Sequence, residues 1–128
     1  MNIRVGKRAD GKELHVAWTV QSAEKGNQYL EREARTVSVE GHPRMTHWYV
    51  TVFKMLQHTG AYKSARIWVK HDEVVEHLAG AVSVPDEDPR AALVESIKEL
   101  ANERFLGCEF AETDHYGSDI EAMLAGDD

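Results

Sequence analysis

Positively charged side chains in the first half of the chain are of the type that binds phosphate groups. They form two sets: Arg4, Lys7, Arg8 and Lys12 around a predicted first hairpin, and Arg44, His47, Lys54 and His58 on one face of a predicted helix. Lysine and arginine side chains that neutralise phosphates release counterions, so binding of this kind weakens steeply as the salt concentration rises. The two sets therefore indicate a surface suited to a polyanion such as nucleic acid.

The distribution of charge along the chain supports this interpretation. The net charge is −7, but residues 1–70 hold 12 Lys and Arg against 6 Asp and Glu, whereas residues 71–128 hold 3 against 16. Such an asymmetry is typical of a polyanion-binding face or an acidic tail. The alternative is that both halves simply have solvated charged faces. Trp18 and Tyr29 could stack on bases if their rings are open to solvent, although Trp18 alternates with aliphatic residues as a core residue does.

Seven histidines raise the possibility of a metal site. His71, Asp72 and His115 would provide imidazole and carboxylate ligands if the end of the fourth strand lies near the last loop. His71 and His77 are six residues apart, so they lie on different faces of one short helix and cannot easily share an ion. The alternative is that these histidines have structural or surface roles. Cys108 alternates with apolar residues and is predicted to be a core residue.

Length and composition indicate one globular domain spanning residues 1–128. Apolar residues make up 42% of the chain and charged residues 29%, which argues against global disorder. No apolar run approaches the roughly 18 residues needed to cross a bilayer, so no membrane partner is expected. The single cysteine excludes an internal disulfide and, with an N-terminus that lacks an apolar signal, leads us to expect a cytoplasmic protein.

Residue alternation predicts three antiparallel strands at the start of the chain. A hairpin turn at Ala9–Lys12 follows the first strand, and a charged third strand from Tyr29 to Val39 is typical of a sheet edge. The buried face of the second strand is predicted to comprise Leu14, Val16, Trp18 and Val20.

The rest of the chain alternates between helices and strands. A helix to about His58, with Met45 in its apolar stripe and Thr51 on its polar side, is predicted to end at Gly60. A buried strand at Ala65–Val69 and a short helix from His71 come next. They are followed by a helix with Asp88 as its N-cap and Pro89 as the next residue, and by a strand through Leu106, Cys108 and Phe110. A last helix begins at Ser118, and residues 126–128 are predicted to be frayed.

The resulting order, β-β-β-α-β-α-α-β-α, resembles the ribonuclease H fold over essentially the whole chain. The segments that carry the resemblance are Arg44-Met45 at the start of the first helix, residues 65–72 from strand into helix, and residues 110–117 before the last helix. The resemblance implies an α/β domain with a mixed five-stranded sheet, three antiparallel strands first, flanked by helices.

The same resemblance implies a set of site residues. Active members hold two Mg²⁺ ions with four carboxylates and hydrolyse phosphodiesters. In this chain Asp10, Asp72 and Asp119 would be the catalytic metal ligands for Mg²⁺ or Mn²⁺, with His115 as the proton-transferring histidine. Thr46 stands in place of the glutamate that the family carries in the first helix, and a hydroxyl cannot supply the missing charge.

Each of these aspartates also has a structural interpretation. Asp10 is suited to a hairpin turn, Asp72 to a helix N-cap, and Asp119 to the first turn of a helix, where a negative charge is favourable. The leading hypothesis is accordingly a ribonuclease H-like domain that is not catalytic and binds nucleic acid, such as RNA or an RNA–DNA hybrid, or a protein partner. The alternatives are a divergent metal-dependent nuclease, and a homo-oligomeric module, for instance a homodimer, joined through the third strand or the acidic C-terminal helices.

Overall fold

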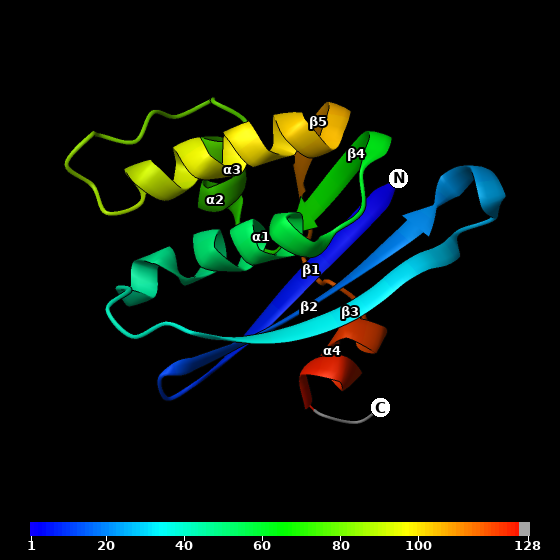
Figure 1. Cartoon of the computed structure of the whole chain (residues 1–128), viewed down its shortest axis with the longest axis horizontal. Helices are drawn as coiled ribbons and strands as arrows, with labels where there is room; N and C mark the ends of the chain where they lie inside the picture. Colours follow the sequence, from blue (N-terminus) through cyan, green and yellow to red (C-terminus); the bar gives the residue numbers. More distant parts are fainter. Residues whose placement is uncertain (126–128) are drawn as a thin grey trace.

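A five-stranded mixed sheet forms the centre of the computed structural model, which describes residues 1–125 (Figure 1). The strands are β1 (Asn2–Asp10), β2 (Glu13–Ser22), β3 (Gln28–Ser38), β4 (Tyr62–Val69) and β5 (Phe105–Glu112). β1, β2 and β3 are antiparallel, β4 runs parallel to β1 and to β5, and the spatial order is β3-β2-β1-β4-β5. The predicted mixed sheet is confirmed, with β3 at one edge. The predicted fraying of residues 126–128 lies outside the described residues.

Helices cover both faces of this sheet. They are α1 (His47–His58), α2 (Asp72–Leu78), α3 (Ala91–Arg104) and α4 (Ser118–Ala125), with short 3₁₀ turns η1 (Ala23–Lys25) and η2 (Arg44–Thr46). α1, α2 and α3 lie on one side of the sheet and α4 lies on the other (Figure 1). The order β-β-β-α-β-α-α-β-α is therefore confirmed. Among residues 1–125 no helix is long and apolar enough to span a bilayer.

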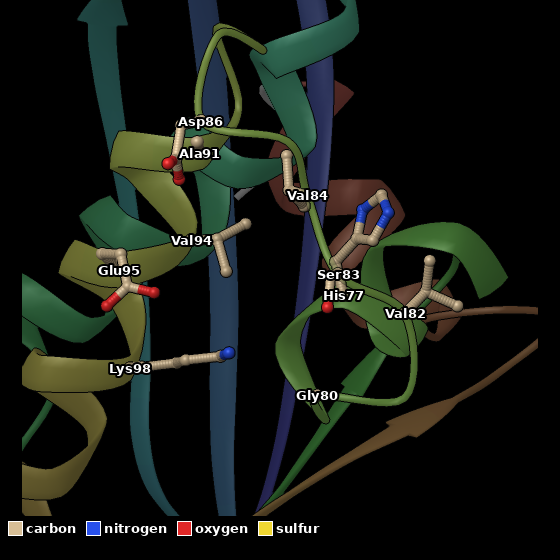
Figure 2. Close-up of a pocket in the computed structure, with 10 residues that line it drawn as sticks. All are labelled: His77, Gly80, Val82, Ser83, Val84, Asp86, Ala91, Val94, Glu95 and Lys98. Atoms are coloured by element: carbon tan, nitrogen blue, oxygen red, sulfur yellow. The ribbon is translucent and has the colours of Figure 1, made fainter.

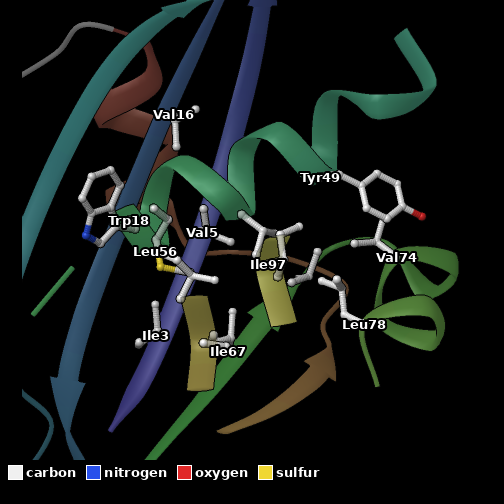
Figure 3. Packing of buried hydrophobic residues seen from close by; sticks show 14 of the residues in the cluster. Ile3, Val5, Val16, Trp18, Tyr49, Leu56, Ile67, Val74, Leu78 and Ile97 are labelled. Carbon is white, nitrogen blue, oxygen red and sulfur yellow. The ribbon is translucent and has the colours of Figure 1, made fainter. Parts of the chain in front are cut away.

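The main core lies between the sheet and α1, α2 and α3 (Figure 3). The second strand has the predicted buried face, and its four members are fully buried: Leu14, Val16, Trp18 and Val20. Because Trp18 is 0% exposed beneath α1, its ring cannot stack on a base, and its core interpretation is confirmed. Tyr29 is 42% exposed, so its ring is open to solvent.

Two apolar side chains of the predicted elements are exposed, and of these Met45 was predicted to belong to a buried stripe. Met45 lies in η2, before α1 begins, and is 51% exposed. Leu106 is 89% exposed because it lies on β5, an edge strand, at a position without a register partner on β4. Conversely, Thr51 on α1 is fully buried, and its hydroxyl is satisfied by donating to the carbonyl of His47 at 2.8 Å. The polarity of a side chain alone was therefore not sufficient to predict its burial at these positions.

The starts of two helices also differ from the predicted ones. His71 is the N-cap of α2, since its ring Nδ1 accepts a hydrogen bond from the backbone N–H of Val74 at 3.4 Å, and Asp72 is the first helical residue. Helix α3 begins at Ala91, not beside Asp88, and Arg90 is its N-cap. The Asp88 carboxylate accepts hydrogen bonds from the backbone N–H and the side chain of Arg90, so it holds the turn that comes just before the helix.

Helix α4 packs on the sheet through a close approach to β1. Ile120 and Leu124 are buried against Ala17 in a second, smaller core. A Cβ atom added at Gly6 would lie 2.7 Å from Cγ2 of Ile120 and 2.8 Å from the ring of Tyr116. The absence of a side chain at Gly6 is therefore what allows α4 to lie this close to the strand.

We predict that Gly6→Ala destabilises the domain by about 1–3 kcal/mol, because α4 must move away from β1 to admit the methyl group. Urea denaturation would measure the change. Gly107→Ala on β5 is the matched control, since among the described residues no heavy atom lies within 4 Å of the added Cβ. Equal stabilities of the two variants would contradict the close packing of α4.

Candidate functional site

Two of the three aspartates expected to bind metal, Asp10 and Asp119, have different surroundings. Asp10 is at the tip of the β1–β2 hairpin, where its carboxylate is 3.8 Å from both Arg8 and His15. Asp119 accepts hydrogen bonds from the hydroxyl of Tyr29 and from the backbone N–H of Ile120. Both carboxylates are thus engaged with neighbouring side chains or backbone.

The packing of α4 on β1 shows where these two positions lie along the sheet. Ile120, which follows Asp119 on α4, packs on Gly6 in the middle of β1. Asp10 is four residues further along β1, which at about 3.3 Å per residue places its Cα atom roughly 13 Å from that of Gly6. Asp10 and Asp119 therefore lie at different points along the strand.

No group of three or more His, Cys, Asp or Glu side chains within residues 1–125 is placed to hold a metal ion. This applies both to the three aspartates and to the set His71, Asp72 and His115. The ring of His115 is used locally: its Nε2 lies 2.7 Å from the carboxylate of Glu121, and its Nδ1 accepts from the N–H of Gly117 at 3.0 Å. The described residues therefore do not fit a pair of Mg²⁺ or Mn²⁺ ions, and catalytic roles for these side chains stay predictions.

Two of the predicted basic residues, by contrast, are brought together. Side chains alternate along β1, so Lys7 follows Ile3 and Val5 on the face that α1 covers, and it reaches the start of that helix. There it meets Arg44, from η2, at a pocket of about 280 Å³ between the first turns of α1 and α2. The pocket is lined by Lys7, Arg44, Met45, Trp48, Tyr49, His71, Glu73, Val74 and Arg90.

Lys7 has an unusual environment in this pocket. Its Nζ atom lies 5.2 Å from the centre of the Trp48 ring, a cation–π distance. Burial and the nearby charge of Arg44 both lower the pKa of Lys7. Within residues 1–125, neither Lys7 nor Arg44 has a carboxylate within 4.0 Å. An anion in the pocket would supply the missing negative charge.

Arg90 forms the far wall of the pocket and is a functional candidate that sequence reasoning missed. Its guanidinium pairs with Asp88 at 2.7 Å and with Glu73 on α2. These hydrogen bonds from Arg90 hold the pKa of the Asp88 carboxyl at about 2. Because Arg90 lies in the acidic half of the chain, its charge gave no signal of a shared site with Lys7. The pairing fixes the loop before α3 against the first turn of α2.

The other predicted basic residues lie outside the pocket. Arg8 donates to the carbonyl of Leu124 at 2.7 Å, and Lys12 pairs with Glu40 at 3.5 Å. Arg4 is exposed on the sheet face that α4 partly covers. The remaining three lie on α1: His47 and Lys54 are half-buried, and His58 is exposed at the end of the helix. The predicted set is thus divided over several surfaces, and only Lys7 and Arg44 share the pocket.

A second pocket of about 330 Å³ lies between α3 and the loop that follows α2 (Figure 2). His77, 5% exposed, borders it, and the ring Nδ1 of His77 is 2.6 Å from the hydroxyl of Tyr49. Lys98 lines the same pocket together with Glu95 and Asp86, so charges of both signs face it. With two carboxylates against one lysine, the lining of the second pocket does not favour an anion.

Comparison with solved structures identifies the fold. The chain is similar to a ribonuclease H1 from Halobacterium salinarum, with a TM-score of 0.67, 12% identity and coverage of 98% of this chain and 97% of that one. It is also similar to the N-terminal ribonuclease H domain of a Mycobacterium tuberculosis protein, solved as a maltose-binding-protein fusion (TM-score 0.64, 12% identity, 93% of each chain covered). A third similar structure is LC11-RNase H1 in complex with an RNA/DNA hybrid (TM-score 0.61, 14% identity, 88% and 83% covered).

The chain therefore has a ribonuclease H-like fold, as its order of strands and helices predicted. No protein-family model matches the sequence, and no curated protein matches it. At 12–14% identity to these three structures, the likeness shows the fold alone and does not assign any residue of the site.

Proposed function

We propose that this ribonuclease H-like domain binds nucleic acid through the pocket of Lys7 and Arg44 and does not hydrolyse it. The observation that carries the proposal is the meeting of two cations, which have no carboxylate partner among residues 1–125, beside the Trp48 ring. Phosphate oxygens would accept hydrogen bonds from both side chains, and Arg44 can engage a phosphate with two parallel N–H donors. Trp48 and the exposed Met45 offer apolar contact to a sugar or base beside that phosphate.

The comparison structures support the choice of ligand. LC11-RNase H1, which shares the fold, is solved in complex with an RNA/DNA hybrid. The proposal that the present chain takes a similar ligand is independent of the metal chemistry, since contacts to phosphate need only positive charge and hydrogen-bond donors.

Equilibrium binding tests the proposal. A fluorescently labelled RNA/DNA hybrid, a DNA duplex and single strands of each kind would be titrated with the protein at low salt and followed by fluorescence anisotropy. We expect the hybrid to bind, and the affinity to fall steeply between about 50 and 200 mM salt. Failure of all these ligands to bind at low salt would exclude the proposal and favour the remaining hypothesis, association with a protein partner or a second copy.

A further inference from the structure

We infer that the part of the sheet face left open beside α4 is a second contact surface, specific for single-stranded nucleic acid. The inference rests on the proposed function and deepens it, because it names a class of ligand and a surface distinct from the Lys7 pocket. We call this surface the open sheet face. It comprises Arg4 on β1, Tyr29 and Arg32 on β3, and Arg66 and Trp68 on β4.

The sheet register places these five side chains on one face. Arg4 pairs with Thr19 on β2, and Thr19 pairs with Arg32 on β3, so the three share a side of the sheet. On the other flank of β1, Arg4 pairs with Trp68 and Asn2 pairs with Arg66. Residues that are directly opposite in neighbouring strands point to the same side. This is the side of α4, away from the core beneath α1.

Helix α4 leaves this region uncovered. Its buried residues pack on Gly6 and Ala17, in the middle of β1 and β2, and Asp119 in its first turn reaches Tyr29. Arg4, Arg32 and Arg66 are exposed, Tyr29 is 42% exposed, and Trp68 is half-buried. Three guanidinium groups thus lie at the surface of strands whose opposite face is the domain core.

Two aromatic rings lie among these arginines. The Arg66 guanidinium carbon is 5.7 Å from the centre of the Trp68 ring, and that of Arg32 is 5.2 Å from the centre of the Tyr29 ring. The Trp68 indole N–H donates to the side-chain oxygen of Asn2 at 3.3 Å, which fixes the ring on the sheet. Each aromatic ring is thus accompanied by an arginine, the combination that stacks bases and binds the adjoining phosphates.

The spacing of the rings favours a single strand over a duplex. Tyr29 on β3 and Trp68 on β4 are separated by β2 and β1, which corresponds to three strand spacings, or about 14 Å across the sheet. An extended strand crossing the sheet could place one base on each ring. In a duplex the bases are already stacked on one another, and their faces are not available to the rings.

Charge on the open sheet face is partly compensated. Glu109 on β5 pairs with Arg66 at 3.1 Å, and Asp119 accepts from the hydroxyl of Tyr29. Among the described residues, Arg4 has no carboxylate within 4.0 Å and donates to Gln21 at 3.4 Å. We therefore expect Arg4 to make the principal phosphate contact and the rings to contribute most of the remaining affinity.

Titrations of labelled oligo(dT) and of the RNA/DNA hybrid test this inference in parallel. Trp68→Leu keeps an apolar side chain on the strand but removes the stacking surface, and we expect it to weaken oligo(dT) binding by about tenfold. The hybrid, held by the Lys7 pocket, should bind with unchanged affinity. Arg4→Gln/Arg66→Gln, which alters exposed side chains only, should lower the salt dependence of oligo(dT) binding by about 1.4 in log–log slope.

Lys63→Gln is the matched control, because Lys63 is exposed on β4 but precedes Ala65 and Ile67 on the opposite side of the strand. Its affinity for oligo(dT) should equal that of the wild type. The inference would be overturned if Trp68→Leu and Arg4→Gln/Arg66→Gln also bound oligo(dT) like the wild type while the hybrid remained bound. Absence of all binding by the wild type would instead overturn the proposed function, so the two failures are distinguishable.

Discussion

The double variant Lys7→Gln/Arg44→Gln is expected to bind the RNA/DNA hybrid roughly 100-fold more weakly than the wild type. A hydrogen bond to a charged partner contributes about 1.5 kcal/mol, so the loss of two such contacts corresponds to about 3 kcal/mol. The slope of log affinity against log salt concentration should decrease by about 2, one for each phosphate contact removed. Fluorescence anisotropy at several salt concentrations measures both quantities.

The folding stability of Lys7→Gln/Arg44→Gln should not decrease, although its affinity for the hybrid does. Because the pKa of Lys7 is lowered, the folded state favours the charged form less than the unfolded state does, and a neutral glutamine removes that penalty. We therefore expect no loss of folding free energy in urea denaturation. This separates a binding role for the pair from a structural one.

Lys25→Gln/Lys63→Gln is the control for net charge. Both lysines are exposed, on η1 and at the start of β4. The double substitution removes two positive charges, the same number as Lys7→Gln/Arg44→Gln. If this variant lost affinity for the hybrid as strongly as Lys7→Gln/Arg44→Gln, the binding would reflect overall charge, and the pocket would have no special role.

Glu31→Ala is expected to lower the free energy of unfolding by about 2–4 kcal/mol, the largest effect that we predict for a single side chain. The Oε2 atom of Glu31 on β3 accepts hydrogen bonds from the hydroxyl of Tyr62, from the backbone N–H of Gly60 at 3.0 Å, and from the hydroxyl of Thr59 at 3.3 Å. Removing the carboxylate leaves three part-buried donors without a partner. Urea denaturation followed by circular dichroism gives the change in stability.

A second measurement follows from the same contact. Burial and the hydrogen bond to Glu31 both raise the pKa of Tyr62 above its ordinary value. Loss of the carboxylate should therefore lower the Tyr62 pKa, which absorbance titration of the tyrosines would detect.

Glu33→Ala is the control, because Glu33 lies two residues along the same strand and faces the same side. It pairs only with Arg35, at 3.4 Å, and both side chains are 44% exposed. Exposed pairs of this kind contribute little, so a change within about 0.5 kcal/mol is expected. An effect of Glu31→Ala no larger than that of Glu33→Ala would contradict the role assigned to the Glu31 carboxylate.

The Glu31 contact also shows how the end of α1 is closed. The helix ends at His58, as predicted, and Gly60 lies just past the cap residue Thr59. Thr59 is extended and Gly60 is not among the residues with positive φ, so the glycine does not close the helix through a left-handed conformation. Its N–H group is satisfied by a glutamate 29 residues earlier in the chain. A partner so distant leaves no trace in the local sequence.

The fold could be predicted because its evidence is local. The alternation of Leu14, Val16, Trp18 and Val20 has the period of a strand with one buried face, and all four residues are indeed buried. The predicted β1–β2 turn follows from Asp10-Gly11, where Gly11 has a φ of 61°. Short-range patterns of this kind were sufficient to give the order of the strands and helices.

The candidate site could be predicted only in part, because its members come from separate elements. Lys7 and Arg44 were identified by charge, but their meeting depends on η2 lying over the end of β1. Trp48 lies within the predicted first helix and Trp68 within the buried strand predicted at Ala65–Val69, and the local sequence marks neither ring as part of a surface. The different surroundings of the aspartates could not be foreseen either, since they depend on how α4 packs on the sheet.

The most direct test of the central claim is the state of an RNA/DNA hybrid after incubation with the protein and Mg²⁺ or Mn²⁺. The hybrid, with its RNA strand labelled, would be held at saturating protein concentration, checked for binding by anisotropy, and then analysed on a denaturing gel. We predict a bound hybrid whose RNA is recovered at full length. RNA that is cleaved by the wild type and left intact by Asp72→Asn would contradict the account and identify the chain as a divergent metal-dependent nuclease.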